Sequence, residues 1–235
     1  MRLIVAQDAE EAARCAAGEL ARACAAALAE RRNACIALSG GRSPRRAFEH
    51  FAAAPLPWTS IVVAQVDERC VAAADPRRNL ATLQATLVDA GSLPRDNLLA
   101  MPVERDDLER AADDYGALLA GRLGAEGRLD IVQLGLGDDG HTASLVPHDP
   151  VLEVVDRDVA TTRPYQGTRR MTLTYRVLQR SRERLWLVTG PTKARALAEL
   201  LDGTGTSPAV RVAREHSVVV ADRAAAPGEV GTTPA

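Results

Sequence analysis

"LDIVQLGLGDDGHTASLVP", residues 129–147, joins an apolar run to a turn that carries glycine, aspartate and histidine. The run LDIVQLGLG predicts a buried strand, and the glycines after it let the backbone turn sharply and approach a small ligand. Asp138 and Asp139 are placed to cap a following helix or to hold His141 in one tautomer. Taken alone, the stretch fits either a ligand-binding turn or an ordinary strand-to-helix turn with an exposed histidine.

Strand-like and helix-like patterns alternate along the rest of the chain, which is typical of a parallel sheet flanked by helices. Besides the run at 129–137, the sequence predicts strands at 34–39, 60–66, 97–103, 169–174, 184–190 and 217–222, the last of which closes the sheet. It predicts helices at 8–32, 44–54, 78–90, 106–123 and 191–201. We therefore expect an α/β fold, a Rossmann-like three-layer sandwich with a mostly parallel sheet flanked by helices. The sequence shows no repeat or linker, so we expect one domain at 1–222 and a disordered tail at 223–235.

Composition restricts the class of protein. The 235 residues carry a formal charge of −2, which gives no general reason to bind nucleic acid or an anionic membrane. No apolar stretch approaches the roughly 20 residues that span a bilayer, and the N-terminal apolar run is too short for a signal sequence. The cysteines form no CxxC pair and do not cluster with histidine, so we expect buried free thiols, no metal site and a cytoplasmic location. They are Cys15, Cys24, Cys35 and Cys70.

Two further strand-to-helix turns carry residues suited to an anion. In open parallel sheets, ligands bind outside the carboxyl ends of the strands. LSGGRSP (38–44) places Ser43 as a helix N-cap, and the free N–H groups of that helix form a phosphate seat, although the spacing matches neither a P-loop nor GxGxxG. VTGPTKA (188–194) places Lys193 in a first helical turn, where a cation is unfavourable unless an anion lies beside it. The alternatives are an ordinary turn and a solvated surface lysine.

Two other segments add charged residues near strand ends. VDERCV (66–71) contributes Asp67 and Arg69, and TRRMTLT (168–174) contributes Arg170. Arginine suits a phosphate because its planar guanidinium donates two parallel hydrogen bonds. Together these segments predict one anion-binding site at the edge of the sheet.

ALSGGRSP, VDERCV, GLGDDGHTASLVP, RRMTLT and LVTGPTKARAL, in this order, resemble the 6-phosphogluconolactonase family over residues 3–220. The resemblance implies hydrolysis of 6-phosphogluconolactone in the pentose phosphate pathway, on a Rossmann-like α/β fold, in the cytoplasm. It implies no metal and no organic cofactor. The expected partner is a small sugar-phosphate lactone, with no nucleic acid and no membrane, and the expected state is a monomer or small homo-oligomer.

The resemblance also implies roles for individual residues. His141 is the general base that takes a proton from the attacking water and then protonates the leaving ring oxygen. Asp139 or Asp67 orients the imidazole, and Arg69 stabilises the oxyanion or organises Asp67. The residues expected to hold the 6-phosphate are Gly40, Gly41, Arg42, Ser43, Arg170 and Lys193. The chain has no G-x-S-x-G nucleophile elbow, which argues against a covalent acyl-enzyme.

The chain departs from the family pattern at a few positions. Arg42 replaces a small residue of the phosphate loop, and Arg78 precedes Asn79 where the family has serine. Related glucosamine-6-phosphate deaminases carry a glutamate five residues after the histidine, where this chain has Val146. Two alternatives remain open, a sugar-phosphate isomerase or deaminase of the same fold and a non-catalytic sugar-phosphate sensor. A sensor would need an output element, and the sequence contains no DNA-binding motif or second domain.

Overall fold

The main sheet has seven parallel strands in the order β1-β10-β9-β6-β2-β3-β5. The computed structural model describes residues 1–124 and 126–226, apart from the side chains of residues 42 and 43. The strands of this sheet are β1 (Arg2–Ala6), β2 (Ala34–Leu38), β3 (Ile61–Gln65), β5 (Leu98–Leu99), β6 (Ile131–Leu134), β9 (Glu183–Val188) and β10 (Ser217–Asp222). The first and last of the described strands are neighbours, because β1 pairs with β10.

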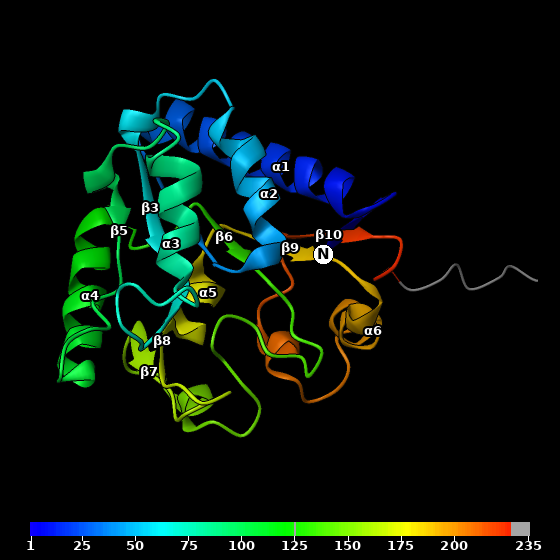
Figure 1. Ribbon diagram of the computed structural model, residues 1–235. Helices are drawn as coiled ribbons and strands as arrows, with labels where there is room; N and C mark the ends of the chain where they lie inside the picture. Colours follow the sequence, from blue (N-terminus) through cyan, green and yellow to red (C-terminus); the bar gives the residue numbers. More distant parts are fainter. Residues whose placement is uncertain (125, 227–235) are drawn as a thin grey trace, which may run out of the picture.

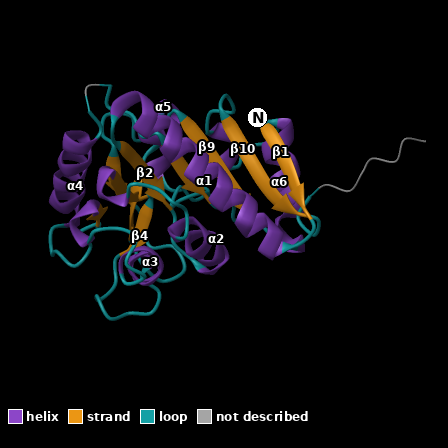
Figure 2. Cartoon of the chain, turned by 90° about the horizontal axis from the view of Figure 1, so that it is seen from above, coloured by secondary structure: helices purple, strands orange, loops and turns teal. Residues whose placement is uncertain are grey.

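Alternate residues of each strand enter two separate apolar cores, because successive side chains point to opposite faces of a sheet. In β2, Ile36 joins the core on one face and Ala37 the core on the other. Helices cover both faces, as Figures 1 and 2 show. The first face is covered by α1 (Ala9–Arg31), α2 (Arg42–Ala52) and α3 (Asn79–Leu83). The second is covered by α4 (Leu108–Arg122), α5 (Tyr175–Arg180) and α6 (Ala194–Asp202). The predicted three-layer α/β fold is confirmed.

A second, antiparallel sheet was not predicted as such. It consists of β4 (Asp67–Arg69), β8 (Arg170–Leu173) and β7 (Val159–Thr161), in that order. The predicted strand at 169–174 therefore exists, but it pairs outside the main sheet. Its register places Arg69 opposite Arg170, so pairing of the two strands brings two predicted site arginines together.

Several boundaries differ from the prediction. Strand β1 occupies the sheet edge, so β10 lies inside the sheet and does not close it. Helix α2 begins at Arg42 with Gly41 as its N-cap, so Ser43 is not the cap: the chain enters helical geometry directly after Gly41, whose φ is 117°. The predicted helix at 78–90 ends as a π-helical turn at Gln84–Val88. Single 3₁₀ turns cover Trp58–Ser60, Arg95–Asn97, Pro150–Glu153, Pro191–Lys193 and Pro208–Arg211.

The first four residues of the predicted tail lie within the described part of the chain. Residues 223–226 form a turn in which Ala225 is buried and donates its N–H to Asp222. Residues 227–235, the rest of the predicted tail, lie outside the described residues. Within the described part of the chain, no helix combines the length and apolar character needed to cross a bilayer. All four cysteines are free; Cys24 and Cys35 are buried, whereas the other two are half-buried.

Candidate active site

A cavity of about 200 Å³ opens at the carboxyl ends of β2, β6 and β9. Parallel strands that end at the same edge bring their following loops together, which is why a site collects there. The cavity is lined by seven of the predicted site residues, namely Gly40, Gly41, Asp67, Arg69, His141, Arg170 and Lys193. Asp139 lies directly behind His141, and the side chains of Arg42 and Ser43 lie outside the described residues.

His141 and Asp139 form a hydrogen-bonded pair at the cavity wall. Nδ1 of His141 lies 2.6 Å from Oδ1 of Asp139, and Oδ2 of Asp139 accepts a hydrogen bond of 2.9 Å from the hydroxyl of Tyr165. Burial by itself raises the pKa of Asp139, but the backbone N–H and imidazole of His141 and the Tyr165 hydroxyl outweigh it and lower that pKa. Of the two aspartates proposed to orient His141, Asp139 therefore makes the contact.

The loop after β6 continues without the helix that the sequence suggested. Asp138 and Asp139 cap no helix, because residues 138–149 form turns and an isolated bridge between Thr142 and Leu145. Asp139 instead accepts the backbone N–H of His141 at 3.1 Å. Its side chain therefore closes a tight turn and orients the imidazole at the same time.

Gly137 leaves room for this pair. A Cβ on Gly137 would lie 2.1 Å from Nδ1 of His141 and 2.5 Å from Oδ1 of Asp139. Real Cβ contacts are essentially never that short, so any side chain at 137 displaces the pair. The glycine is required by close approach of the imidazole.

Arg170 brings an incompletely paired guanidinium to the cavity. Its side chain is buried, and its Nε has no hydrogen-bond partner among the described residues. Its carbon Cζ lies 5.0 Å from the ring centroid of Tyr165, and Nη2 makes a long 3.4 Å bond to Gln166. Burial lowers the pKa of Arg170, because a desolvated cation is disfavoured. A buried guanidinium with donors to spare is suited to an anionic ligand.

Two loops bring further donors and a second cation. Gly41, the N-cap of the 11-residue helix α2, lines the cavity. The free backbone N–H groups at the start of this helix therefore lie beside the cavity. Lys193 ends the 3₁₀ turn after β9, and its Nζ lies 4.0 Å from Oδ1 of Asp138. Asp222 fixes this turn by accepting the N–H of Gly190 at 3.0 Å.

Asp67 and Arg69 are linked through Asn79. The amide of Asn79 donates to Oδ1 of Asp67 at 3.2 Å and accepts from Nη1 of Arg69 at 2.9 Å. Ser144 donates to Oδ2 of Asp67 at 2.6 Å. Burial raises the pKa of Asp67 more than Ser144 and Arg170 lower it. Within the described residues, Asp67 makes no hydrogen bond to His141, and Arg69 is linked to Asp67 by hydrogen bonds only through Asn79.

Comparison with known proteins identifies the family. Residues 7–221 match the family described as glucosamine-6-phosphate isomerases/6-phosphogluconolactonase. The chain belongs to this family. A 6-phosphogluconolactonase from Synechocystis is 39% identical over 178 residues, which cover 74% of each protein. The structure of a 6-phosphogluconolactonase from Thermotoga maritima superposes with a TM-score of 0.84 at 26% identity, over 94% of this chain and 98% of that one.

The same fold also carries the family's other activity. A monomeric glucosamine-6-phosphate deaminase superposes with a TM-score of 0.81 at 21% identity, over 96% of this chain and 98% of that one. At that identity the likeness shows the fold alone. Local residues, rather than the fold, therefore separate the two reactions in this family.

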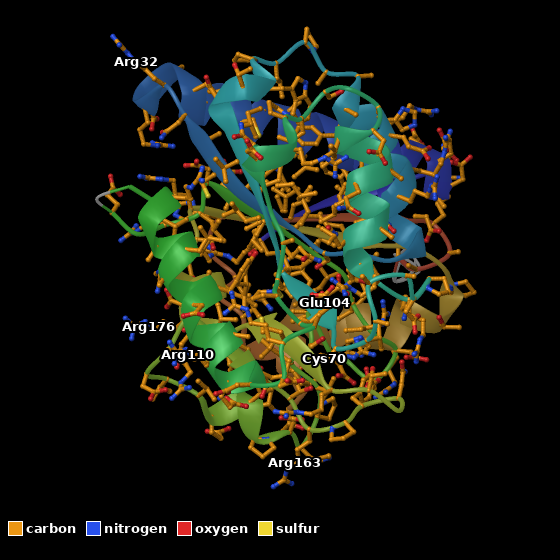
Figure 3. The ribbon with its side chains drawn as sticks, turned by 60° about the vertical axis from the view of Figure 1, so that its left-hand side comes forward. Arg32, Cys70, Glu104, Arg110, Arg163 and Arg176 are labelled. Atoms are coloured by element: carbon orange, nitrogen blue, oxygen red, sulfur yellow. The ribbon has the colours of Figure 1, made fainter. Side chains whose placement is uncertain are left out.

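Sequence reasoning missed Tyr165 and Asn79 as site residues. Tyr165 lies in the connection between β7 and β8, where the sequence predicts no element. The pairing of these two strands places its hydroxyl within hydrogen-bond distance of Asp139. Asn79 follows Arg78, whose side chain is buried and ion-paired 3.2 Å from Glu68 and also with Glu104, labelled in Figure 3. The sequence showed that Arg78 replaces the family's serine, but it did not show that Arg78 pairs with Glu68 and Glu104.

No group of three or more histidine, cysteine or acidic side chains suited to a metal occurs in residues 1–124 and 126–226.

Proposed function

We propose that this chain hydrolyses 6-phospho-D-glucono-1,5-lactone to 6-phospho-D-gluconate in the oxidative pentose phosphate pathway, with His141 as general base. One observation carries the proposal: the His141–Asp139 pair, 2.6 Å apart, adjoins a cavity that Arg170 and Lys193 also line. A proton acceptor and two cations around one cavity fit a phosphorylated substrate that reacts with water. Membership of the family and the 39% identity to a relative named 6-phosphogluconolactonase support the same reaction.

The hydrogen bond to Asp139 determines which nitrogen of His141 reacts. In the neutral imidazole, Nδ1 carries the proton that is donated to Asp139, so Nε2 keeps a lone pair. Nε2 takes a proton from water as its oxygen attacks the lactone carbonyl carbon. When the tetrahedral intermediate collapses, the carbon–oxygen bond of the ring breaks and Nε2–H returns the proton to the ring oxygen. Such acid–base catalysis is typically worth about 10²–10⁴-fold.

The remaining residues hold and orient the anion. Arg170 and Lys193 bind the 6-phosphate together with backbone N–H groups of the loop at 40–43, at the N-terminus of α2. Arg69 adds positive charge to the same wall. Holding the phosphate at a fixed distance from His141 places the carbonyl near the activated water.

The test is a direct assay. Freshly prepared 6-phosphogluconolactone is followed with and without the protein, because this lactone also hydrolyses spontaneously. We expect loss of lactone well above the spontaneous rate, with 6-phosphogluconate as product. A rate equal to the spontaneous one, from folded protein, would refute the proposal.

The two alternatives make different predictions from the same sample. A deaminase would release ammonia from glucosamine 6-phosphate, whereas a sensor would bind the sugar phosphate without converting it. Position 146, where deaminases carry a glutamate, holds a buried valine that does not line the cavity. This favours the lactonase. The cytoplasmic location and the oligomeric state stay predictions.

A further inference from the structure

Tyr165 contacts both halves of the site, the base and the phosphate cation. Its hydroxyl donates to Oδ2 of Asp139 at 2.9 Å, and its ring packs edge-to-face against His141 with centroids 5.5 Å apart. The guanidinium of Arg170 lies over the same ring, 5.0 Å from its centroid. Burial, and the hydrogen bond to Asp139, raise the pKa of Tyr165 to about 12, so the hydroxyl keeps its proton near neutral pH.

A tight hairpin turn between β7 and β8 holds Tyr165 in this place. The N–H of Tyr165 donates to the carbonyl of Thr168 at 2.9 Å, and Thr168 donates back at 3.3 Å. The two residues between them have positive φ angles, 51° at Gln166 and 83° at Gly167, as a two-residue hairpin turn requires. Arg163, on the same connection, points away from the ribbon in Figure 3. The second sheet, rather than the main one, thus carries the tyrosine to the site.

The guanidinium of Arg170 has few other fixed contacts in this region. Its Nε has no hydrogen-bond partner among the described residues, and its bond to Gln166 is long, at 3.4 Å. The charges of Asp67 and Arg69 also act on this guanidinium, and the ring of Tyr165 is the aromatic contact that links it to the His141–Asp139 pair. An anion bound to Arg170 would fix the guanidinium, and through their contact it would fix the ring and the direction of its hydroxyl toward Asp139.

We propose that Tyr165 is a positioning residue that couples an anion bound at Arg170 to the alignment of the Asp139–His141 pair. The inference rests on the proposed function, since it assigns the 6-phosphate as that anion. Its consequence is that phosphate binding contributes to kcat as well as to KM, because an interaction that aligns the base lowers the barrier to the chemical step. Tyr165 itself transfers no proton and does not touch the lactone carbonyl.

The experiment separates the phosphate from the lactone. The unphosphorylated D-glucono-1,5-lactone is offered with and without inorganic phosphate, and the hydrolysis that phosphate causes without protein is subtracted. We expect saturating phosphate to stimulate the parent protein about tenfold, which corresponds to about 1.4 kcal/mol of barrier. In Tyr165→Phe the stimulation falls below about twofold, although calorimetry gives a dissociation constant for phosphate within about twofold of the parent value. With 6-phosphogluconolactone, the variant loses about tenfold in kcat and keeps its KM within about twofold.

Tyr175→Phe is the matched control. The hydroxyl of Tyr175 donates to the carbonyl of Pro208 at 2.8 Å, and its ring faces Arg211 at 4.7 Å, but it lies outside the cavity. This control is expected to keep both the activity and the stimulation by phosphate.

The possible outcomes separate the inference from the function on which it rests. Absence of stimulation in an active parent, or equal stimulation in the parent and Tyr165→Phe, overturns the coupling and leaves the lactonase intact. A fall in kcat in Tyr175→Phe equal to that in Tyr165→Phe also overturns it, because any tyrosine hydroxyl would then serve. A folded parent that does not hydrolyse 6-phosphogluconolactone overturns the proposed function, and this inference with it.

Discussion

Replacing Gly137 by alanine tests the position of the proposed base, His141, without changing the chemistry of its side chain. The new Cβ would lie 2.1 Å from Nδ1 of His141 and 2.5 Å from Oδ1 of Asp139. Both contacts are with side chains, and the φ of Gly137 is not among the positive ones, so alanine strains no backbone there. We therefore expect a folded protein with a displaced His141–Asp139 pair.

The size of the effect follows from these distances. Ordinary van der Waals contact begins at 3.4 Å, so the imidazole must retreat by at least the difference between 3.4 and 2.1 Å, or 1.3 Å. A misplacement of about 1 Å in an active site costs about 10²-fold in rate. We expect kcat of Gly137→Ala to fall about 10²-fold, toward the value for His141→Ala, for which loss of a general base predicts about 10²–10⁴-fold. The melting temperature should change by less than about 4 °C.

The assay is hydrolysis of 6-phosphogluconolactone under saturating substrate, with the spontaneous rate subtracted. Gly121→Ala, in helix α4, is the control, since a Cβ there meets nothing within 4 Å. The double variant Gly137→Ala/His141→Ala should be no slower than His141→Ala, because both changes remove the same contribution. If Gly137→Ala kept more than about a third of the parent kcat, the displacement of His141 would not have the expected effect. If Gly137→Ala slowed the His141→Ala protein further, the alanine would act other than through His141.

Three further predictions concern the phosphate site, Asp67 and the competing reaction. Lys193→Met should raise KM for 6-phosphogluconolactone about tenfold and leave KM for unphosphorylated gluconolactone unchanged, and equal effects on the two substrates would remove Lys193 from the phosphate site. Burial raises the pKa of Asp67 above its ordinary value of 3.8, so the stability it adds is full below that pH and is lost as pH rises through the folded value. Urea unfolding measured at rising pH, from 3.8 upward, should therefore show the parent losing stability relative to Asp67→Asn, and a constant difference would contradict the burial effect. Glucosamine 6-phosphate should release no measurable ammonia while the lactone is consumed rapidly, and comparable rates would favour the deaminase.

Six of the seven strands of the main sheet were predictable because they are apolar runs separated by clear helical patterns, whereas the edge strand β1 was not predicted. β2 and β10 are buried at every residue, as a strand covered on both faces must be. The second sheet was not predictable in the same way. Strand β4 is three charged residues, Asp67–Arg69, and its pairing with β8 is set by tertiary contact rather than by apolar periodicity.

The site was predictable residue by residue but not in its connections. Glycine-rich turns at strand ends and the histidine after Gly-Asp-Asp-Gly indicated which residues converge. Which carboxylate holds His141 depended on side-chain geometry, and Asp139 is favoured because it lies two residues away in the same turn. Tyr165 could not be found by spacing, because 24 residues separate it from His141 and the contact exists only through the β7–β8 hairpin.

Position 146 bears on which of the family's two activities the site of this chain fits. In this chain the loop after β6 brings His141 to the cavity, while Val146 is buried with 3% of its surface exposed and does not line the cavity. A glutamate placed at 146 on this backbone would bury a carboxylate, which is costly without a partner. It would also stand away from the cavity in which a substrate would bind. On this backbone, exchanging Val146 for glutamate alone would therefore not place a carboxylate among the residues that line the cavity. Lactone hydrolysis needs no carboxylate at 146, because one base and one bound water suffice, and the loop seen here fits that simpler requirement.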